Sequence, residues 1–263
     1  AKSLGQNFLI EGWVAEDIAA AGCPEGCGVL EVGPGIGALT VQLARRAEKV
    51  VSVELDRRLP PVLAETMADF ANFTLVEGDV MQQDLSALVR QHFSGLRPVL
   101  CANLPYNITT PFLTACVEAG CFESVTVMIQ KEVAQRLCAA PGTGEYGAFS
   151  VLVQWYAEPK LLFDVPPHCF VPQPKVTSAV VCLRTRPAPA DIRDEVLFFR
   201  TVRASFAQRR KTLVNGLASG FPQLTKAELT DVLAACGLPA NVRGETLGLE
   251  GFAALSNAIG ERL

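Results

Sequence analysis

The sequence predicts an α/β protein: a mainly parallel sheet with a terminal antiparallel hairpin, followed by a small all-α C-terminal domain. Three observations predict this fold class. Short apolar runs rich in β-branched residues alternate with stretches of helical spacing in the N-terminal part of the chain. Two further runs, near 159–165 and 176–185, have no long helix between them. Beyond the proline-rich segment 186–190 the spacing is helical throughout.

The elements follow in order along the chain. The parallel strands are expected at 29–33, 50–54, 73–77, 98–103 and 124–129. After the rigid linker 186–190, Thr225 can cap a helix with Glu228 three residues later, and Gly237-Leu238-Pro239 ends that helix. The closing stretch Leu249–Ile259 also has helical spacing.

The composition fits a globular protein with two domains. A chain of 263 residues, 49% of them apolar, allows one large and one small domain, which we place at 1–186 and 187–263. No apolar run approaches the length of a membrane span and no secretory signal is visible, so we expect a cytoplasmic protein.

A glycine-rich turn follows the first expected strand. The segment Gly28–Thr40 should run from strand through turn into helix, with glycines at 33, 35 and 37. Glycines let the backbone approach a ligand closely, and the following helix N-terminus adds the positive end of a dipole. A dinucleotide-binding fold would place the third glycine one residue later. This spacing, with Glu31 inside the strand, resembles the first motif of S-adenosylmethionine-dependent methyltransferases.

Two carboxylates follow the next strands. Glu54 ends the second strand, about twenty residues past the glycine turn, a position that suits hydrogen bonds to a ribose diol. Asp79 follows the third strand and could accept a hydrogen bond from an adenine amino group. Either acid alone could be a solvated loop residue. The ordered series of glycine turn, Glu54, Asp79 and Asn103 at successive strand ends favours a ligand site.

The tetrapeptide Asn103-Leu104-Pro105-Tyr106 stands at the end of the fourth strand. The Asn103 amide offers an acceptor and two donors. The proline stiffens the turn, so that the Pro105 carbonyl is expected to face a ligand, and Tyr106 offers a ring on which a base can stack. These groups suit a nucleobase amino group held in front of an electrophile. A strand-ending turn is the alternative.

Five segments in order make the resemblance specific and carry it from the first residues to the C-terminal helices: Lys2–Leu9, the glycine turn, Asn103–Ile108, Phe170–Val180 and Phe206–Leu213. Together they resemble the small-subunit ribosomal RNA adenine N6,N6-dimethyltransferases of the KsgA type. The resemblance implies a Rossmann-like S-adenosylmethionine-dependent methyltransferase fold with S-adenosylmethionine as cofactor. It also implies an immature small ribosomal subunit as partner, and we expect a monomer.

The resemblance also implies a role for each motif residue. Asn7 and Leu9 would close over the cofactor, and Gly33 would pack against its methionine part. Glu54 would hold the ribose and Asp79 the adenine. Asn103 would contact the cofactor and face the target amine with the Pro105 carbonyl. The rings of Tyr106 and Phe170 would enclose the flipped adenine.

The net charge of −4 is unusual for a protein that binds RNA, but the charge is unevenly distributed. Residues 200–211 hold five cations and no acid, and residues 187–263 carry nine cations against eight acids. We therefore expect RNA to bind at a local patch formed by Arg209, Arg210 and Lys211. A solvated helix start is the alternative. A patch this small implies weak binding to naked RNA.

The nine cysteines lie mostly among apolar neighbours, which is typical of free, buried thiols in a cytosolic chain. Cys23 with Cys27, or Cys116 with Cys121, could form metal-binding pairs. Only two histidines are present and no regular Cys-x-x-Cys occurs, so we expect no metal.

Three other functions are compatible with the sequence. A large-subunit ribosomal RNA methyltransferase of the macrolide-resistance type would share the catalytic domain. A DNA adenine methyltransferase would usually carry Pro-Pro-Tyr where this chain has Leu104-Pro105-Tyr106. A non-catalytic ribosome-assembly or transcription factor on the same fold could keep the pocket, and turnover on immature subunits would decide.

Overall fold

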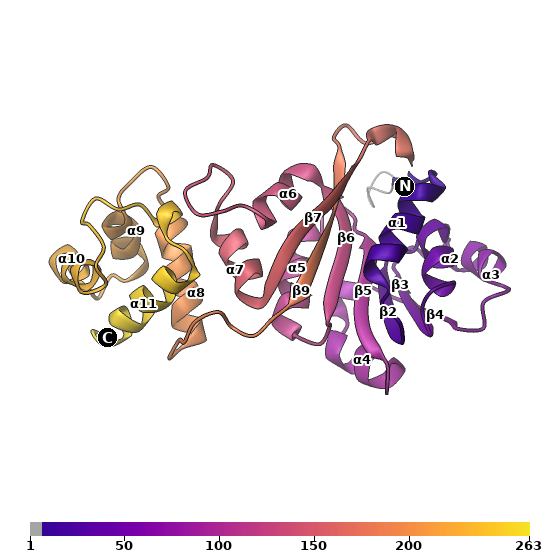
Figure 1. Ribbon diagram of the computed structural model, residues 1–263, viewed down its shortest axis with the longest axis horizontal. Helices are drawn as coiled ribbons and strands as arrows, with labels where there is room; N and C mark the ends of the chain where they lie inside the picture. Colours follow the sequence, from indigo (N-terminus) through magenta and orange to yellow (C-terminus); the bar gives the residue numbers. More distant parts are fainter. Residues whose placement is uncertain (1–6) are drawn as a thin grey trace. The chain divides into compact units, whose positions relative to one another are not determined.

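The computed structural model describes residues 7–263, so Lys2–Gln6 of the first motif lie outside the described residues. The chain divides into two compact units. The first comprises the chain up to Ala134 together with Ala157–Thr185, and the second comprises Gln135–Tyr156 and Arg186–Leu263. Each is described by itself (Figure 1).

The first unit is built on a seven-stranded sheet with the order β4-β3-β2-β5-β6-β9-β7. Its strands are β2 (Cys27–Val32), β3 (Lys49–Glu54), β4 (Phe73–Glu77), β5 (Arg97–Asn103), β6 (Ser124–Gln130), β7 (Ala157–Val165) and β9 (Ser178–Thr185). The first five pair in parallel, whereas β9 pairs antiparallel with both β6 and β7. The expected parallel sheet and terminal hairpin are confirmed. A separate two-stranded sheet joins β1 (Phe8–Leu9) to β8 (Phe170–Val171).

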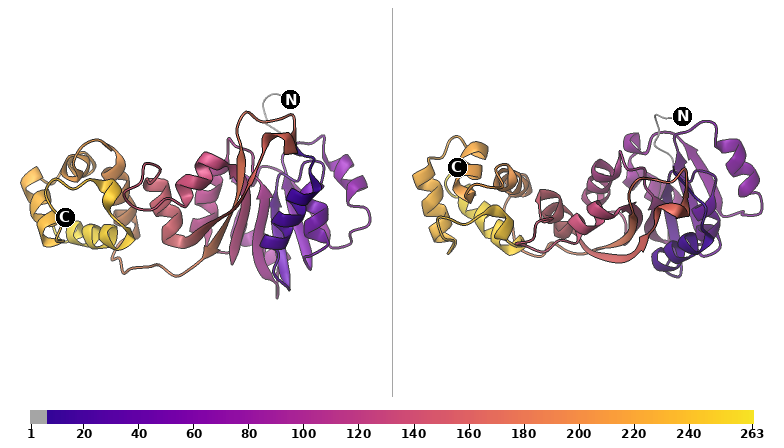
Figure 2. Two further views of the ribbon diagram at one scale, coloured as in Figure 1. Left: turned by 45° about the horizontal axis from the view of Figure 1, so that its top comes forward. Right: turned by 90° about the horizontal axis from the view of Figure 1, so that it is seen from above.

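Helices connect the parallel strands: α1 (Gly12–Gly22), α2 (Ala38–Ala44), α3 (Pro60–Thr66), α4 (Leu85–His92) and α5 (Thr109–Ala119). Right-handed crossovers from β2 towards β4 place α2 and α3 on one face, and the return through β5 and β6 places α4 and α5 on the other. Contacts of α1 with α2, and of α4 with α5, agree with this arrangement (Figures 1 and 2). Short 3₁₀ turns at Val80–Gln82 and Pro167–Cys169 complete the unit.

The strand order reverses between β2 and β5, because the chain first builds outward to β4 and then returns. At such a reversal the loops leave in opposite directions and open a crevice beyond the carboxyl ends of the strands. Here β2 ends at Val32 beside the glycine turn, and β5 ends at Asn103. The sheet therefore places the two most informative sequence motifs at one crevice.

The second unit is helical: α7 (Ala148–Tyr156), α8 (Glu195–Phe206), α9 (Leu213–Gly220), α10 (Lys226–Ala235) and α11 (Leu249–Gly260), with a 3₁₀ turn at Gly244–Thr246. Its core is aromatic, and the rings of Trp155 and Phe198 lie 4.2 Å apart between centroids. The predicted capping box of Thr225 and Glu228 is present at the start of α10.

The compact units divide the chain differently from the expected boundary at 186/187. Residues 135–156, expected in the first domain, belong to the helical unit. The physical reason is the apolar face of α7, where Val151 and Trp155 are buried in the core of that unit. Helix α6 (Lys131–Leu137) spans the point at which the chain leaves the sheet unit. Within residues 7–263, no helix is both long and apolar enough to cross a membrane.

Candidate active site

A cavity of about 290 Å³ lies at the strand reversal of the sheet unit. Its size is near the lower end of the range for small-molecule sites. Every residue that the sequence predicted to bind the cofactor or to act in catalysis lines this cavity: Asn7, Leu9, Gly33, Glu54, Asp79, Asn103, Pro105, Tyr106 and Phe170. The structure thus brings together side chains from four strand ends, the N-terminal strand and the segment before β9.

The glycine turn forms the floor next to β2. Gly33, Gly35 and Gly37 all have positive φ, at 65°, 60° and 94°, which a residue with a Cβ adopts only with strain. A Cβ on Gly35 would also lie 3.3 Å from the ring of Phe8. Phe8 belongs to β1, which pairs with β8, so the N-terminal strand lies across the turn. Glycine is therefore required here by both backbone angle and close approach.

Two carboxylates are fixed by backbone amides. Glu54 is 5% exposed, and its two oxygens accept hydrogen bonds from the amides of Gly35 at 3.2 Å and Asp56 at 2.8 Å. Burial raises the pKa of the Glu54 carboxyl above its ordinary value, opposed by these amide donors. Asp79 caps the following 3₁₀ turn, where its side chain accepts from the amide of Met81 at 2.9 Å.

A third carboxylate, Glu31, faces the same cavity from within β2. It is 1% exposed, and the hydroxyl of Ser52 donates to it at 2.6 Å. Burial raises the pKa of Glu31 to about 7, although the hydrogen bond from Ser52 acts in the opposite direction. Glu31, Glu54 and Asp79 line the cavity, and no Lys, Arg or His does so among the described residues. This set of charges suits a cationic ligand and fits the sulfonium and hydroxyl groups of S-adenosylmethionine.

The Asn103 motif differs from expectation in one respect. The carbonyl of Pro105 accepts hydrogen bonds from the amide of Ile108 at 3.2 Å and the hydroxyl of Thr109 at 3.1 Å. The prediction that this carbonyl is free to face a ligand is therefore wrong, because it holds the first turn of α5. The Leu104 carbonyl accepts no hydrogen bond from residues 7–263, although the Leu104 amide donates to Met128 at 3.1 Å.

The two aromatic residues have different settings. Tyr106 is half-buried, and its hydroxyl shares a hydrogen bond of 2.8 Å with that of Ser178. Phe170 is 1% exposed and packs in the core of the sheet unit beside Leu9, its register partner in the small sheet. Both rings reach the cavity, Tyr106 from the loop after β5 and Phe170 from β8.

Sequence reasoning missed several apolar lining residues, among them Leu55, Met81 and Ile108. Leu55 is 52% exposed and Met81 40%, which is high for large apolar side chains. Leu55 follows Glu54 directly and Met81 stands two residues after Asp79, so their positions just past strand ends could have predicted that they line the cavity.

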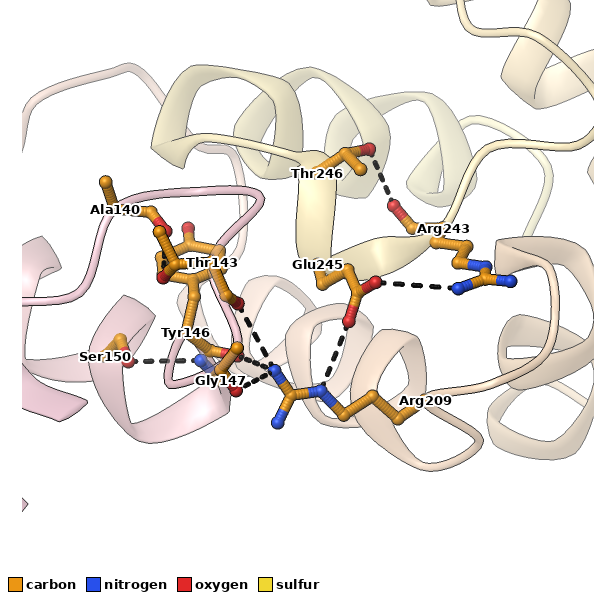
Figure 3. Close-up of polar contacts among 10 residues, drawn as sticks. Ala140, Thr143, Tyr146, Gly147, Ser150, Arg209, Arg243, Glu245 and Thr246 are labelled. Atoms are coloured by element: carbon orange, nitrogen blue, oxygen red, sulfur yellow. Dashed lines mark hydrogen bonds and ion pairs between the residues drawn. The ribbon is translucent and has the colours of Figure 1, made fainter. Parts of the chain in front are cut away.

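Arg209, which the sequence predicts to bind RNA, is exposed but also has bonding partners within the helical unit. Its guanidinium donates to the backbone carbonyls of Tyr146 at 3.0 Å and Gly144, and to the carboxylate of Glu245 at 3.2 Å (Figure 3). Its Nε and one terminal nitrogen are bonded within the helical unit, whereas the other terminal nitrogen has no hydrogen-bond partner among residues 7–263. The Gly142 amide donates to the Glu245 carbonyl at 2.7 Å, so Arg209 and Glu245 together fix the loop that precedes α7.

The other cations between residues 200 and 211 differ in exposure and in their partners. Arg200 donates to the Gly220 carbonyl at 2.7 Å and its guanidinium lies over the ring of Phe221, so it too is structural. Arg210 and Lys211 are exposed, in the turn between α8 and α9. The cysteines are free thiols, and among residues 7–263 no group of three His, Cys, Asp or Glu side chains is arranged to hold a metal.

A parallel sheet with its crevice at the strand reversal, a glycine turn and carboxylates at the next two strand ends define the Rossmann-like S-adenosylmethionine-dependent methyltransferases. Comparison with known proteins narrows this class. The profile of the family described as "Ribosomal RNA adenine dimethylase" matches residues 1–243. The chain belongs to this family, which confirms the resemblance predicted from the motifs.

Comparison with individual proteins agrees with this family assignment. The chain is 45% identical to "Ribosomal RNA small subunit methyltransferase A" of Alkaliphilus oremlandii, covering 100% of this chain and 92% of that protein. It is 48% identical to the protein of the same name from Bacillus thuringiensis, covering 98% and 90%. Among solved structures, the 23S rRNA methyltransferase ErmE has a TM-score of 0.73 at 25% identity, covering 97% of this chain and 100% of that chain. A dimethyladenosine transferase from Plasmodium falciparum reaches 0.78 at 23% identity, covering 94% and 95%, which supports the fold.

Proposed function

We propose that this protein transfers methyl groups from S-adenosylmethionine to N6 of two adjacent adenines in small-subunit ribosomal RNA during ribosome biogenesis. The observation that carries the proposal is the single cavity in which the Asn103 amide, the stacking ring of Tyr106 and three carboxylates meet at the strand reversal. The names of the curated relatives favour the small-subunit enzyme over the large-subunit alternative.

The cofactor, when bound, supplies a methyl group activated by its positive sulfur. Glu54 would hold the ribose hydroxyls, which is supported by its buried carboxylate next to the glycine turn at Gly35. Asp79, which lines the same cavity, would accept a hydrogen bond from the adenine amine of the cofactor. Asn7 and Leu9 would close the cavity from the N-terminal strand, and Gly33 leaves room for the methionine part.

The target amine is a poor nucleophile, because its lone pair is delocalised into the adenine ring. Two acceptors that bond its two N–H groups favour a pyramidal nitrogen whose lone pair points at the methyl group. The Asn103 side-chain oxygen is one acceptor. Since the Pro105 carbonyl is occupied, we propose as the second acceptor the carbonyl of Leu104, a cavity-lining residue whose carbonyl accepts no hydrogen bond from residues 7–263. No strong general base is needed, and orientation supplies most of the acceleration.

The adenine must leave its stack to reach this amide, at a cost of a few kcal/mol. Stacking on the ring of Tyr106 offsets part of that cost. Phe170 would contact the opposite face of the adenine, and its burial leaves its ring little freedom to move.

We propose that the binding partner is ribosomal RNA within an immature small subunit. Such a partner would place the protein in the cytoplasm. We also propose that the protein acts as a monomer. Arg210 and Lys211 are exposed cations that suit phosphate contacts. Two side chains on a chain of net charge −4 imply weak affinity for naked RNA, so the assembled subunit has to supply further contacts.

The test uses Asn103→Ala. This variant should bind S-adenosylmethionine and immature small subunits, yet lose most methyl transfer, because Asn103 is proposed to act at the reacting nitrogen. Methyl incorporation into subunits from a strain that lacks the gene measures it, and primer extension on that strain's RNA locates the paired adenines. Near-normal turnover by the variant would contradict the assigned role. Binding without turnover by the unaltered protein would favour the non-catalytic assembly factor.

A further inference from the structure

The loop that carries Tyr106 does little to fix the orientation of its ring. Tyr106 lies in the loop between β5 and α5, and within residues 7–263 neither its amide nor its carbonyl forms a backbone hydrogen bond. The side chain is half-buried and one side of it borders the cavity. A tyrosine held only by its own loop could turn about its two side-chain torsions, so that the plane of the ring would vary.

A single polar contact fixes the far end of this ring. The hydroxyl oxygens of Tyr106 and Ser178 lie 2.8 Å apart, although the residues are 72 positions apart in the sequence. This distance is ideal for a hydroxyl–hydroxyl hydrogen bond. The loop side chain is thereby tied to a strand of the main sheet.

Ser178 is a rigid anchor. It is fully buried and begins β9, where it pairs with Gln130 of β6 on one side and Val165 of β7 on the other. Because β9 runs antiparallel to β6, this first residue lies at the same edge of the sheet as the carboxyl ends of the parallel strands. Ser178 does not line the cavity, so any effect it has on the reaction passes through Tyr106.

We propose that Ser178 is a positioning residue: its hydroxyl fixes the plane of the Tyr106 ring and thereby sets the orientation of the target adenine. This inference rests on the proposed function, since it concerns how the adenine is aligned with Asn103. Loss of the hydrogen bond leaves the aromatic face in place for stacking but removes its fixed angle. The rate of methyl transfer should therefore fall more than RNA affinity.

A double-mutant cycle tests the proposal with Tyr106→Phe, Ser178→Ala and the double variant, on immature small subunits. Each single variant should lower kcat by about 3- to 10-fold, the effect of one lost hydrogen bond, with KM for subunit and cofactor changed by no more than about twofold. The double variant should be no slower than either single variant, because both changes remove the same contact.

Thr126→Val is the matched control. Thr126 is a fully buried hydroxyl residue on β6, and its oxygen has no hydrogen-bond partner among the described residues. The Thr126→Val variant should have an unchanged kcat. If Ser178→Ala unfolds, Tyr106→Phe still tests the contact from the loop side, where only one hydroxyl oxygen is removed.

Three outcomes would overturn the inference: a normal kcat in Tyr106→Phe, multiplied losses in the double variant, or a loss confined to thermal stability. The proposed function fails separately, since an unaltered protein that methylates no small-subunit adenine would refute it whatever the cycle shows.

Discussion

Replacement of Arg209 by alanine should destabilise the helical unit, whereas the same change at Arg210 should not. Arg209 donates to the carbonyl of Tyr146, a fully buried residue, and pairs with Glu245 (Figure 3). Arg210, its exposed neighbour, provides the matched control.

The magnitude follows from burial. The Arg209 side chain is 44% exposed and that of Glu245 24%, so their ion pair contributes at most about 1 kcal/mol. The charge-assisted bonds to backbone carbonyls of Tyr146 and Gly144 add about 1–2 kcal/mol after the same discount for solvent. The expected loss is about 2 kcal/mol for Arg209→Ala, against less than about 0.5 kcal/mol for Arg210→Ala. Arg209→Lys keeps the charge without the planar fork and should recover less than half.

Urea unfolding followed by circular dichroism gives the free energy of unfolding, and hydrogen exchange gives the local effect. The amide of Gly142, bonded to the Glu245 carbonyl, should exchange about 30-fold faster in Arg209→Ala, the equivalent of about 2 kcal/mol. Equal unfolding midpoints for Arg209→Ala and Arg210→Ala, with unchanged exchange in the loop, would refute the reasoning. RNA binding would then be the remaining role of Arg209.

Three further predictions concern the cavity and the RNA contacts. Glu54→Ala should weaken S-adenosylmethionine binding by about 1.5–3 kcal/mol in calorimetry, the scale of a charge-assisted hydrogen bond, and an unchanged affinity would remove Glu54 from the site. Because burial raises the pKa of Glu31 from 4.5 to about 7, its ionisation should cost the free protein stability as pH rises through that range. Glu31→Gln should abolish a loss on the order of 1–3 kcal/mol between about pH 5 and about pH 8, and equal urea midpoint shifts in both proteins would contradict this. Reversal of Arg210 and Lys211 to glutamate should weaken cosedimentation with small subunits and reduce the log–log salt slope by about one unit per lost contact, while an unchanged slope would place the contacts elsewhere.

Local patterns were enough to predict the parallel strands, the hairpin and the α10 cap. Strands such as β5 are short apolar runs with turn residues at their ends, and the capping box of Thr225 and Glu228 depends on residues three apart. The cavity followed as well, because the carboxyl ends of parallel strands meet at one edge. Each of these inferences uses residues that are close in sequence or are related by a simple rule of sheet topology.

The errors share a different cause. The sequence did not predict the structural partners of Arg209, because Tyr146 and Glu245 are 63 and 36 residues away, beyond the reach of any charge pattern. The Pro105 carbonyl looked free because the sequence does not show where α5 begins. In both cases a polar group assigned to a ligand also forms hydrogen bonds within the protein, and only the folded structure reveals those partners.

The assignment of residues 135–156 to the helical unit limits how the chain can be truncated. A protein ended after Arg186 would keep α7 but lose α8, and so would expose Trp155, which is 2% exposed beside Phe198 in the whole chain. Such a fragment should aggregate through this apolar surface. Removal or exchange of the helical unit requires cuts at three junctions, 134/135, 156/157 and 185/186, so recombination at a single crossover would not yield an intact catalytic half.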